Sequence, residues 1–197
     1  MGIIGVLSTV IVIGQSTFNK TVILSNTAYD VALAIRSAET FGLGSRTTKG
    51  LLLNSGYGMH FVPLTSTFLM FADNDPVAEG CHKVPTTKEL APNATPGDCK
   101  YDPAKDALVQ TYTLGNSTSV SDVCVFSASA SMCSPTVRSL DIVFSRPNTT
   151  TYLSINGDDY SAAYTKAYVK LSSRGGESYV CINNTGIISV VPTADAC

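Results

Sequence analysis

The first forty residues of the chain constrain its fold more than any other stretch. They begin as an apolar run from Ile3 to Gly14 and continue, without a proline, into an amphipathic pattern that ends near Phe41. Read as one helix, residues 3–41 extend roughly 60 Å at about 1.5 Å per residue. A domain of 197 residues has a radius of gyration of only about 16 Å. One end of such a helix must therefore protrude, and the protruding end is the apolar one.

The first half of this helix, residues 1–17, is predicted to belong to a membrane helix. Its apolar side chains are Ile3, Ile4, Val6, Leu7, Val10, Ile11, Val12 and Ile13. The run is shorter than the roughly 20 residues that span a bilayer. A signal peptide is disfavoured because no Lys or Arg precedes the run. We therefore expect the printed chain to begin inside a longer membrane helix.

The second half of the helix, residues 18–41, is predicted to pack against a sheet. Apolar residues recur there at alternating spacings of four and three, which places them on one face. These residues are Leu24, Ala28, Val31, Ile35 and Ala38, and the stripe is widened by Val22, Tyr29 and Leu33. Gly42 and Gly44 then provide a C-terminal stop for the helix.

After a polar linker the hydrophobic pattern changes to the alternation that is typical of strands. The predicted strands are 57–62, 67–72, 108–114, 120–126, 139–144, 163–172, 178–183 and 187–191. Residues 73–104 are rich in turn-forming residues, which predicts a loop insertion rather than a packed element. The sequence thus predicts an α+β fold, in which a long N-terminal helix packs on an antiparallel β-sheet. The globular domain would cover residues 18–197.

Six cysteines lie in the second part of the chain, at Cys81, Cys99, Cys124, Cys133, Cys181 and Cys197. None forms a CxxC pair, and the adjacent Cys81 and His82 have poor geometry for holding one zinc ion. Disulfides are therefore favoured, which indicates an oxidising compartment. We favour the sequential pairing 81–99, 124–133 and 181–197, because each bond closes a short loop rich in turn residues.

Composition excludes several function classes. The net charge of −2 and the low charged fraction of 14% leave no broad basic field for nucleic acid. No catalytic constellation, cofactor motif or small-molecule substrate site is expected, so an enzyme such as a secreted hydrolase is disfavoured. We interpret the other candidates as structural: His60 as a half-exposed strand residue, the acidic clusters 73–75 and 156–159 as turns rather than calcium sites, and Lys166, Lys170 and Arg174 as a solvated strand face.

An apolar helix that continues into an amphipathic one, followed by a small disulfide-bearing antiparallel sheet, resembles type IV pilins and the pseudopilins of type II secretion. Residues 18–46 look like the second half of the long pilin helix in the minor-pseudopilin branch. Residues 56–61 with 68–73 are similar to the first hairpin of that branch, and residues 173–190 to its closing hairpin. With the apolar start, these segments cover somewhat under half of the chain.

The resemblance implies a structural subunit of a bacterial filament. The apolar helix would hold the subunit in the inner membrane and later pack with other pilin subunits, as a homo- or hetero-polymer at the cell surface. Nothing in the sequence matches the family's basic leader or the residues at which it is cleaved and methylated, so no processing residue is assigned. Either these residues lie ahead of Met1, or the protein is not processed in that way. The alternative is a membrane-tethered extracellular adhesin or binding module rich in β-structure. A plain anchor would not need the amphipathic continuation from Leu24 to Ala38.

Overall fold

The computed structural model describes residues 2–44, 56–74, 97–145, 150–158 and 162–197, and in the helix it describes side chains from Asn19 onward. The elements in chain order are α1 (Gly2–Leu43), β1 (Gly56–Phe61), β2 (Thr67–Asp73), β3 (Ala107–Thr113), β4 (Ser119–Ser127), β5 (Ser131–Cys133), β6 (Leu140–Phe144), β7 (Thr151–Ile155), β8 (Tyr164–Ser173), β9 (Gly176–Asn183), β10 (Ile188–Val191) and the short 3₁₀ helix η1 (Ala194–Ala196). A long N-terminal helix thus precedes an antiparallel β-structure, as the sequence predicts.

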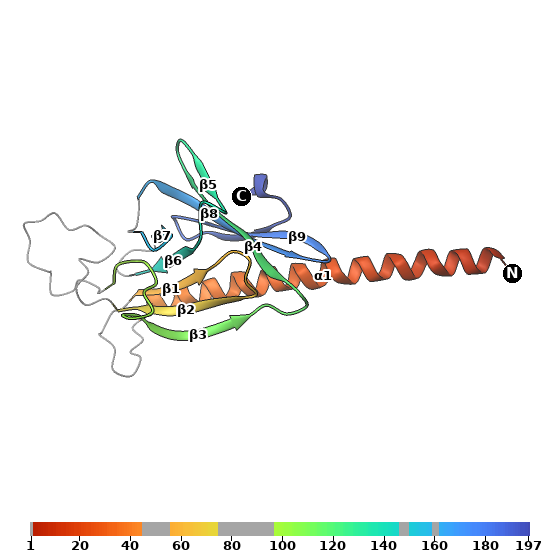
Figure 1. Cartoon of the computed structure of the whole chain (residues 1–197), viewed down its shortest axis with the longest axis horizontal. Coiled ribbons are helices and arrows are strands. Elements are labelled where there is room, and N and C mark those ends of the chain that lie inside the picture. Colours follow the sequence, from red (N-terminus) through yellow and green to blue (C-terminus); the bar gives the residue numbers. More distant parts are fainter. Residues whose placement is uncertain (1, 45–55, 75–96, 146–149, 159–161) are drawn as a thin grey trace, which may run out of the picture.

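Helix α1 is continuous over 42 residues. It ends where glycines were expected to stop it, and the N–H of Gly44 donates to the carbonyl of Thr40 at 2.9 Å. Figure 1 shows that its C-terminal half lies along the strands, while its N-terminal half extends well beyond them. The arrangement agrees with the length argument, because a helix this long exceeds the dimensions of its own domain.

The prediction of one sheet is wrong, because the described strands form two antiparallel sheets of five strands each. Their orders are β3-β2-β1-β6-β7 and β10-β9-β8-β4-β5, here called sheet A and sheet B. The sequence analysis missed β5 and β7. Strand β5 has only three residues, and β7 has five residues that are all buried, so neither shows the alternation of a half-exposed strand.

Backbone hydrogen bonds join the two sheets at two places. Thr65, in the turn between β1 and β2, forms a bridge with Val120 of β4. On the other side, the N–H of Thr151 at the start of β7 donates to the carbonyl of Asn184 after β9, at 3.0 Å. These links hold sheet A and sheet B in a fixed relation, and α1 lies against both.

The main core lies between α1 and the two sheets. The helix contacts β1 and β6 of sheet A and β8, β9 and β10 of sheet B. The predicted packing face is buried in this core: Leu24, Ala28, Val31, Ile35 and Ala38 are each at most 2% exposed. Fully burying one large aliphatic side chain stabilises a fold by about 1.5–3 kcal/mol. The helix is therefore an integral part of the domain.

Two glycines lie where a strand or turn meets the backbone of α1. A Cβ at Gly42, near the end of the helix, would meet the carbonyl of Phe144 in β6. A Cβ at Gly175, in the turn between β8 and β9, would lie 2.5 Å from the carbonyl oxygen of Lys20. Both contacts are too close for a side chain, so the absence of one lets the helix sit directly on both sheets.

Candidate functional site

The candidate functional element is α1 and the surface around the point where it leaves the domain. Besides Ile23, which is 39% exposed, three large apolar side chains of its described half are exposed: Val22 is 39%, Tyr29 56% and Leu33 59% exposed. The sequence analysis assigned them to the packing face, and that assignment is wrong. The two sheets cover only the helix face around Ala28, so residues at the edge of the wide apolar stripe remain exposed to solvent.

The other half of α1 was predicted to enter a membrane or a filament core. The residues named for this role run from Ile3 to Ile13, and their backbone is helical. Their side chains lie outside the described part of the structure. Among the described residues, no helix combines the length and the apolar character that crossing a membrane requires.

The described disulfides join Cys124 to Cys133 and Cys181 to Cys197, which are two of the three pairings that the sequence favours. Cys99 is also disulfide-bonded, and its expected partner Cys81 lies outside the described residues. The bond of Cys124 joins neighbouring strands β4 and β5. The bond of Cys181 attaches Cys197, the last residue of the sequence, to β9.

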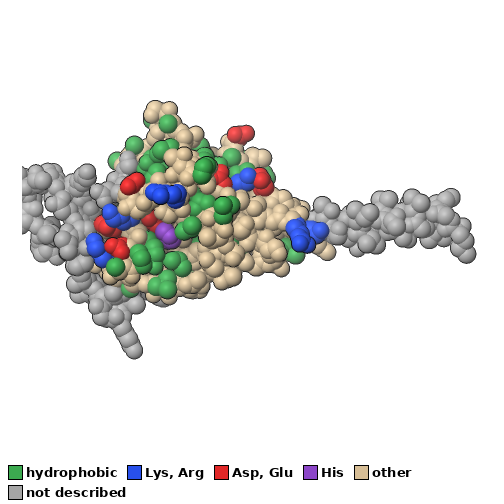
Figure 2. All heavy atoms as spheres, in the orientation of Figure 1, with side chains coloured by type: hydrophobic (Ala, Val, Ile, Leu, Met, Phe, Trp, Pro, Cys, Tyr) green, Lys and Arg blue, Asp and Glu red, His purple; other side chains and the backbone are tan. Residues whose placement is uncertain are grey.

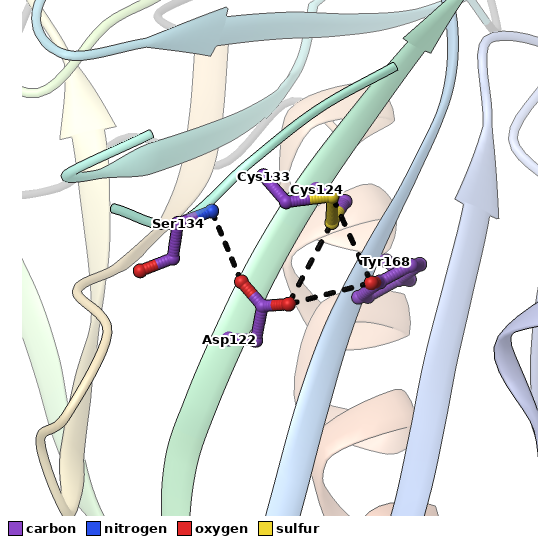
Figure 3. The surroundings of a disulfide bond; sticks show 5 residues. All are labelled: Asp122, Cys124, Cys133, Ser134 and Tyr168. Carbon is purple, nitrogen blue, oxygen red and sulfur yellow. Dashed lines mark hydrogen bonds between the residues drawn. A yellow bond between two sulfur atoms is a disulfide. The ribbon is translucent and has the colours of Figure 1, made fainter. Parts of the chain in front are cut away.

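Polar groups surround the first of these disulfides on the outer face of sheet B (Figure 3). The Asp122 carboxylate accepts the N–H of Ser134 at 3.1 Å and the Tyr168 hydroxyl at 3.4 Å. Burial, and then the charge of Asp122, raise the pKa of Tyr168 to about 12. Asp122, Cys124 and Cys133 are close enough to share a metal ion, but the sulfurs are bonded to each other and offer no thiolate. The cluster is therefore structural.

A largely buried, hydrogen-bonded histidine–aspartate pair lies on the opposite side of the domain, on the outer face of sheet A. Nδ1 of His60 in β1 lies 2.6 Å from a carboxylate oxygen of Asp141 in β6, and their side chains are 17% and 1% exposed. The Tyr101 ring packs 4.8 Å from the His60 ring. Burial raises the pKa of Asp141, and the hydrogen bond from His60 offsets part of that rise. Asp141 is the one charge in an apolar strand, which is the sequence signal that could have revealed the pair.

This pair does not form part of a catalytic triad with the neighbouring serine. The register places His60, Asp141 and Ser154 side by side across β1, β6 and β7, so the carboxylate lies between the other two groups. A Ser-His-Asp triad needs the histidine in the middle. The Ser154 hydroxyl instead donates to the carbonyl of Cys99 at 2.6 Å. The arrangement fixes the segment around Cys99 onto the sheet, and His60 adds its ring contact with Tyr101.

The described ends of the predicted loop insertion lie against the domain, and residues 75–96 lie outside the described part of the structure. Cys99 and Asp73 are fully buried. The Asp73 carboxylate accepts the N–H groups of Asp98 and Cys99 at 3.0 and 2.8 Å, and Asp106 accepts those of Asn74 and Asp102 at 3.0 and 2.7 Å. A loop can become a packed element when buried carboxylates satisfy its backbone donors.

Burial changes the acidity of these carboxyl groups. Burial and the charge of Asp106 raise the pKa of Asp73 well above its usual value. Burial also raises the pKa of Asp106 to about 6, against hydrogen bonds that lower it. In the other acidic cluster, Asn156 accepts the N–H of Arg138 at 2.6 Å and donates to the carbonyl of Thr136 at 3.1 Å. The described members of both clusters thus organise backbone turns.

Two of the three cations near the C-terminus are engaged rather than solvated. Lys170 pairs with Glu177 at 2.7 Å, and Lys166 donates to the carbonyl of Cys197 at 2.6 Å. Arg174 is exposed at the turn between β8 and β9. The three side chains therefore have different surroundings and do not act as one basic face.

Comparisons with known proteins give no assignment, because no family model, no curated protein and no solved structure matches the chain.

Proposed function

We propose that the chain is a structural subunit of a filament of the type IV pilus or type II secretion pseudopilus kind. One observation carries the proposal: α1 is a single helix whose C-terminal half forms the spine of the domain and whose N-terminal half projects from it (Figure 1). A helix of this kind couples an apolar segment rigidly to a folded domain. A flexible anchor would not require the buried face from Leu24 to Ala38.

The mechanism is assembly rather than catalysis. Before assembly, the projecting half of α1 holds the subunit in the inner membrane of a bacterium. During assembly it leaves the lipid and packs among the helices of neighbouring subunits. Its apolar side chains stay out of water in both states, so the transfer costs little hydrophobic free energy. A head-to-tail interface that does not close on itself produces a filament.

The folded domain would form the outer surface of this filament. Disulfides such as Cys124–Cys133 and Cys181–Cys197 suit an oxidising location outside the cytoplasm. They join neighbouring strands and fix the end of the printed chain, which supports a surface that resists local unfolding. Such a surface can contact other molecules without changing how the helix assembles.

The proposal is tested by placing a charge in the projecting half. Val10→Asp and Ile11→Asp introduce a carboxylate that neither lipid nor a helix bundle accommodates, at a cost of about 2.5–3.5 kcal/mol or more per subunit. We expect these variants to be absent from sheared surface filaments in electron microscopy, while the wild type and the matched control Val10→Leu are present. Normal incorporation of Val10→Asp would contradict the filament proposal.

The same experiment separates assembly from folding. The domain of each variant should keep its disulfides and its thermal unfolding midpoint, because residues 10 and 11 lie in the part of α1 that projects from the strands (Figure 1). A wild-type chain that stays in the membrane and forms no filament would favour the tethered adhesin or binding module instead.

A further inference from the structure

A hollow of about 220 Å³ lies beside α1 where the helix leaves the domain. Three segments distant in sequence form its wall. Lys20 and Ile23 come from the helix, Asn116 and Ser117 from the turn between β3 and β4, and Ser173 and Arg174 from the turn between β8 and β9. Figure 1 shows both turns reaching the helix at this level. The wall thus offers an ammonium, a guanidinium, two hydroxyls and an amide.

The hollow is positively charged. Lys20 and Arg174 are both exposed, and neither forms an ion pair with a residue that the structure describes. Figure 2 shows Lys and Arg atoms gathered at the base of the domain, beside the projecting helix. Both side chains donate hydrogen bonds and accept none. An anion with several oxygen acceptors is therefore the complementary ligand.

The turn between β8 and β9 is held close to the helix by specific contacts. The Thr21 hydroxyl donates to the carbonyl of Gly175 at 3.3 Å, and no side chain would fit at Gly175 against the Lys20 backbone. Asn116 and Ser117 both have a φ of 56°. Consecutive non-glycine residues in this left-handed region are uncommon, because each is sterically disfavoured. The base of the domain thus has a defined shape around the helix.

The position of the hollow points to a lipid headgroup. If residues 2–17 occupy the hydrocarbon, Lys20 lies three residues further, or about 4.5 Å along the helix. The headgroup layer of each leaflet is about 5–8 Å thick. Lys20 and the two turns beside it would then lie at the depth of the phosphates. Arg binds phosphate through two parallel hydrogen bonds, and Lys binds it as a point charge.

We propose that this hollow binds the phosphate group of an anionic phospholipid while the subunit is held in the membrane. The inference rests on the proposed function, because it needs the projecting half of α1 to be in lipid. Lys20 and Arg174 contact the phosphate oxygens, and the hydroxyl and amide groups of Ser117, Ser173 and Asn116 complete the site. The lipid orients the domain on the bilayer surface and is left behind when the subunit enters the filament.

The test compares short-chain lipids with the phosphate ion. The full chain in a neutral detergent is titrated with dihexanoyl phosphatidylglycerol, dihexanoyl phosphatidylcholine or inorganic phosphate, and binding is measured by calorimetry. We expect the wild type to prefer phosphatidylglycerol. Lys20→Gln and Arg174→Gln should each weaken its binding about fivefold, and the double variant roughly 30-fold. The matched control is Lys105→Gln. Lys105 is an exposed lysine just before β3, and the hollow lies beyond the opposite end of that strand.

Three results would overturn the inference. The first is a double variant whose affinity for phosphatidylglycerol stays within twofold of the wild type. The second is equal binding of phosphatidylcholine and phosphatidylglycerol. The third is phosphate binding as tight as that of the lipid, which would identify an ion site rather than a lipid site. Flotation of the wild type with phosphatidylcholine vesicles tests the membrane insertion of α1 separately. A chain that floats but shows no lipid preference refutes only the lipid-binding role of the hollow. A chain that does not float refutes both that role and the proposed function.

Discussion

At the scale of single residues, the most consequential contact is the one between His60 and Asp141. The Asp141 carboxylate is almost fully buried, and it accepts hydrogen bonds from the imidazole and from the Tyr101 backbone. His60→Leu removes the imidazole from that carboxylate, and removing one member of a buried pair costs about 3–5 kcal/mol. We expect a loss near the lower limit, about 3 kcal/mol, because His60 is partly exposed. Urea unfolding of the full chain in a neutral detergent measures it.

The double variant His60→Leu/Asp141→Leu is the control for this prediction. It removes the charge together with its partner, and replacing both members of a buried pair by apolar residues is often close to neutral. We therefore expect the double variant to be more stable than His60→Leu alone. Equal destabilisation in the two variants would show that the loss comes from packing and not from a buried charge.

Asp106 gives the stability of the domain a pH dependence. Its pKa is raised from the usual 3.8 to about 6 in the folded chain, so the folded state binds a proton that the unfolded state lacks in that range. The sign follows from linkage: this contribution is fully present below about 3.8 and is lost as the pH rises through about 6. We expect the free energy of unfolding of the wild type, relative to Asp106→Asn, to rise as the pH falls from 7 to 4.

Asp106→Asn suits this comparison because the amide oxygen can still accept a backbone N–H, while the side chain is uncharged at every pH. Taking the difference between wild type and Asp106→Asn removes the contributions of titrating groups that do not interact with Asp106, including the exposed Glu177, whose lowered pKa acts in the opposite direction. The charge of Asp106 also raises the pKa of Asp73, so Asp73 adds to the difference in the same direction as Asp106. A difference that is constant with pH, or that falls on acidification, would contradict the assignment.

At the scale of elements, two aliphatic side chains of equal size in α1, Ile35 and Leu33, test which face of the helix packs in the core. Ile35 is fully buried in the main core, while Leu33, two residues earlier, is 59% exposed. Ile35→Ala should destabilise the domain by about 2–5 kcal/mol, through lost burial and a residual cavity. Leu33→Ala should change stability by no more than about 0.5 kcal/mol. Chemical unfolding measures the free energy of unfolding of both variants. A larger loss in Leu33→Ala than in Ile35→Ala would show that the opposite face of the helix packs in the core.

Much of this element-level order could be predicted from the sequence. The spacing of Leu24, Ala28, Val31, Ile35 and Ala38 located the face of α1 that packs on the sheets, and alternation located most of the strands. Both patterns follow from how regular elements present their side chains. The disulfide pairings of Cys124 and Cys181 followed from loop length, because each bond closes a short segment with turn residues.

What could not be predicted depends on how elements meet. Strand β7 is buried on both faces, because Leu153 and Ile155 pack in the main core while Tyr152 packs with Cys99 and Tyr101 on the other side, so its sequence carries no alternation. Tyr29 and Leu33 are exposed because the sheets cover only part of the helix, a fact that belongs to the tertiary arrangement. The hollow at Lys20 and Arg174 joins residues 154 positions apart along the chain, a pairing that no local pattern contains.

At the scale of the whole molecule, the direction in which α1 leaves the domain depends on how both ends of its packed half are seated. Near one end Gly175 meets the backbone of Lys20, and near the other Gly42 meets the carbonyl of Phe144. Each contact is with backbone, which cannot rotate away as a side chain can. The helix is therefore clamped at two levels, and the projecting half continues the same axis (Figure 1).

Gly42→Ala tests this clamp. Alanine is a better helix former than glycine by about 1 kcal/mol, but its Cβ would collide with the Phe144 carbonyl. Overpacking against a rigid neighbour costs about 1–3 kcal/mol, so we expect a net loss of stability and fewer filaments, because the helix must shift away from β6. Gly115→Ala is the matched control, since nothing lies within 4 Å of a Cβ there. If both variants unfold and assemble like the wild type, the close seating of α1 on sheet A is not what fixes its direction.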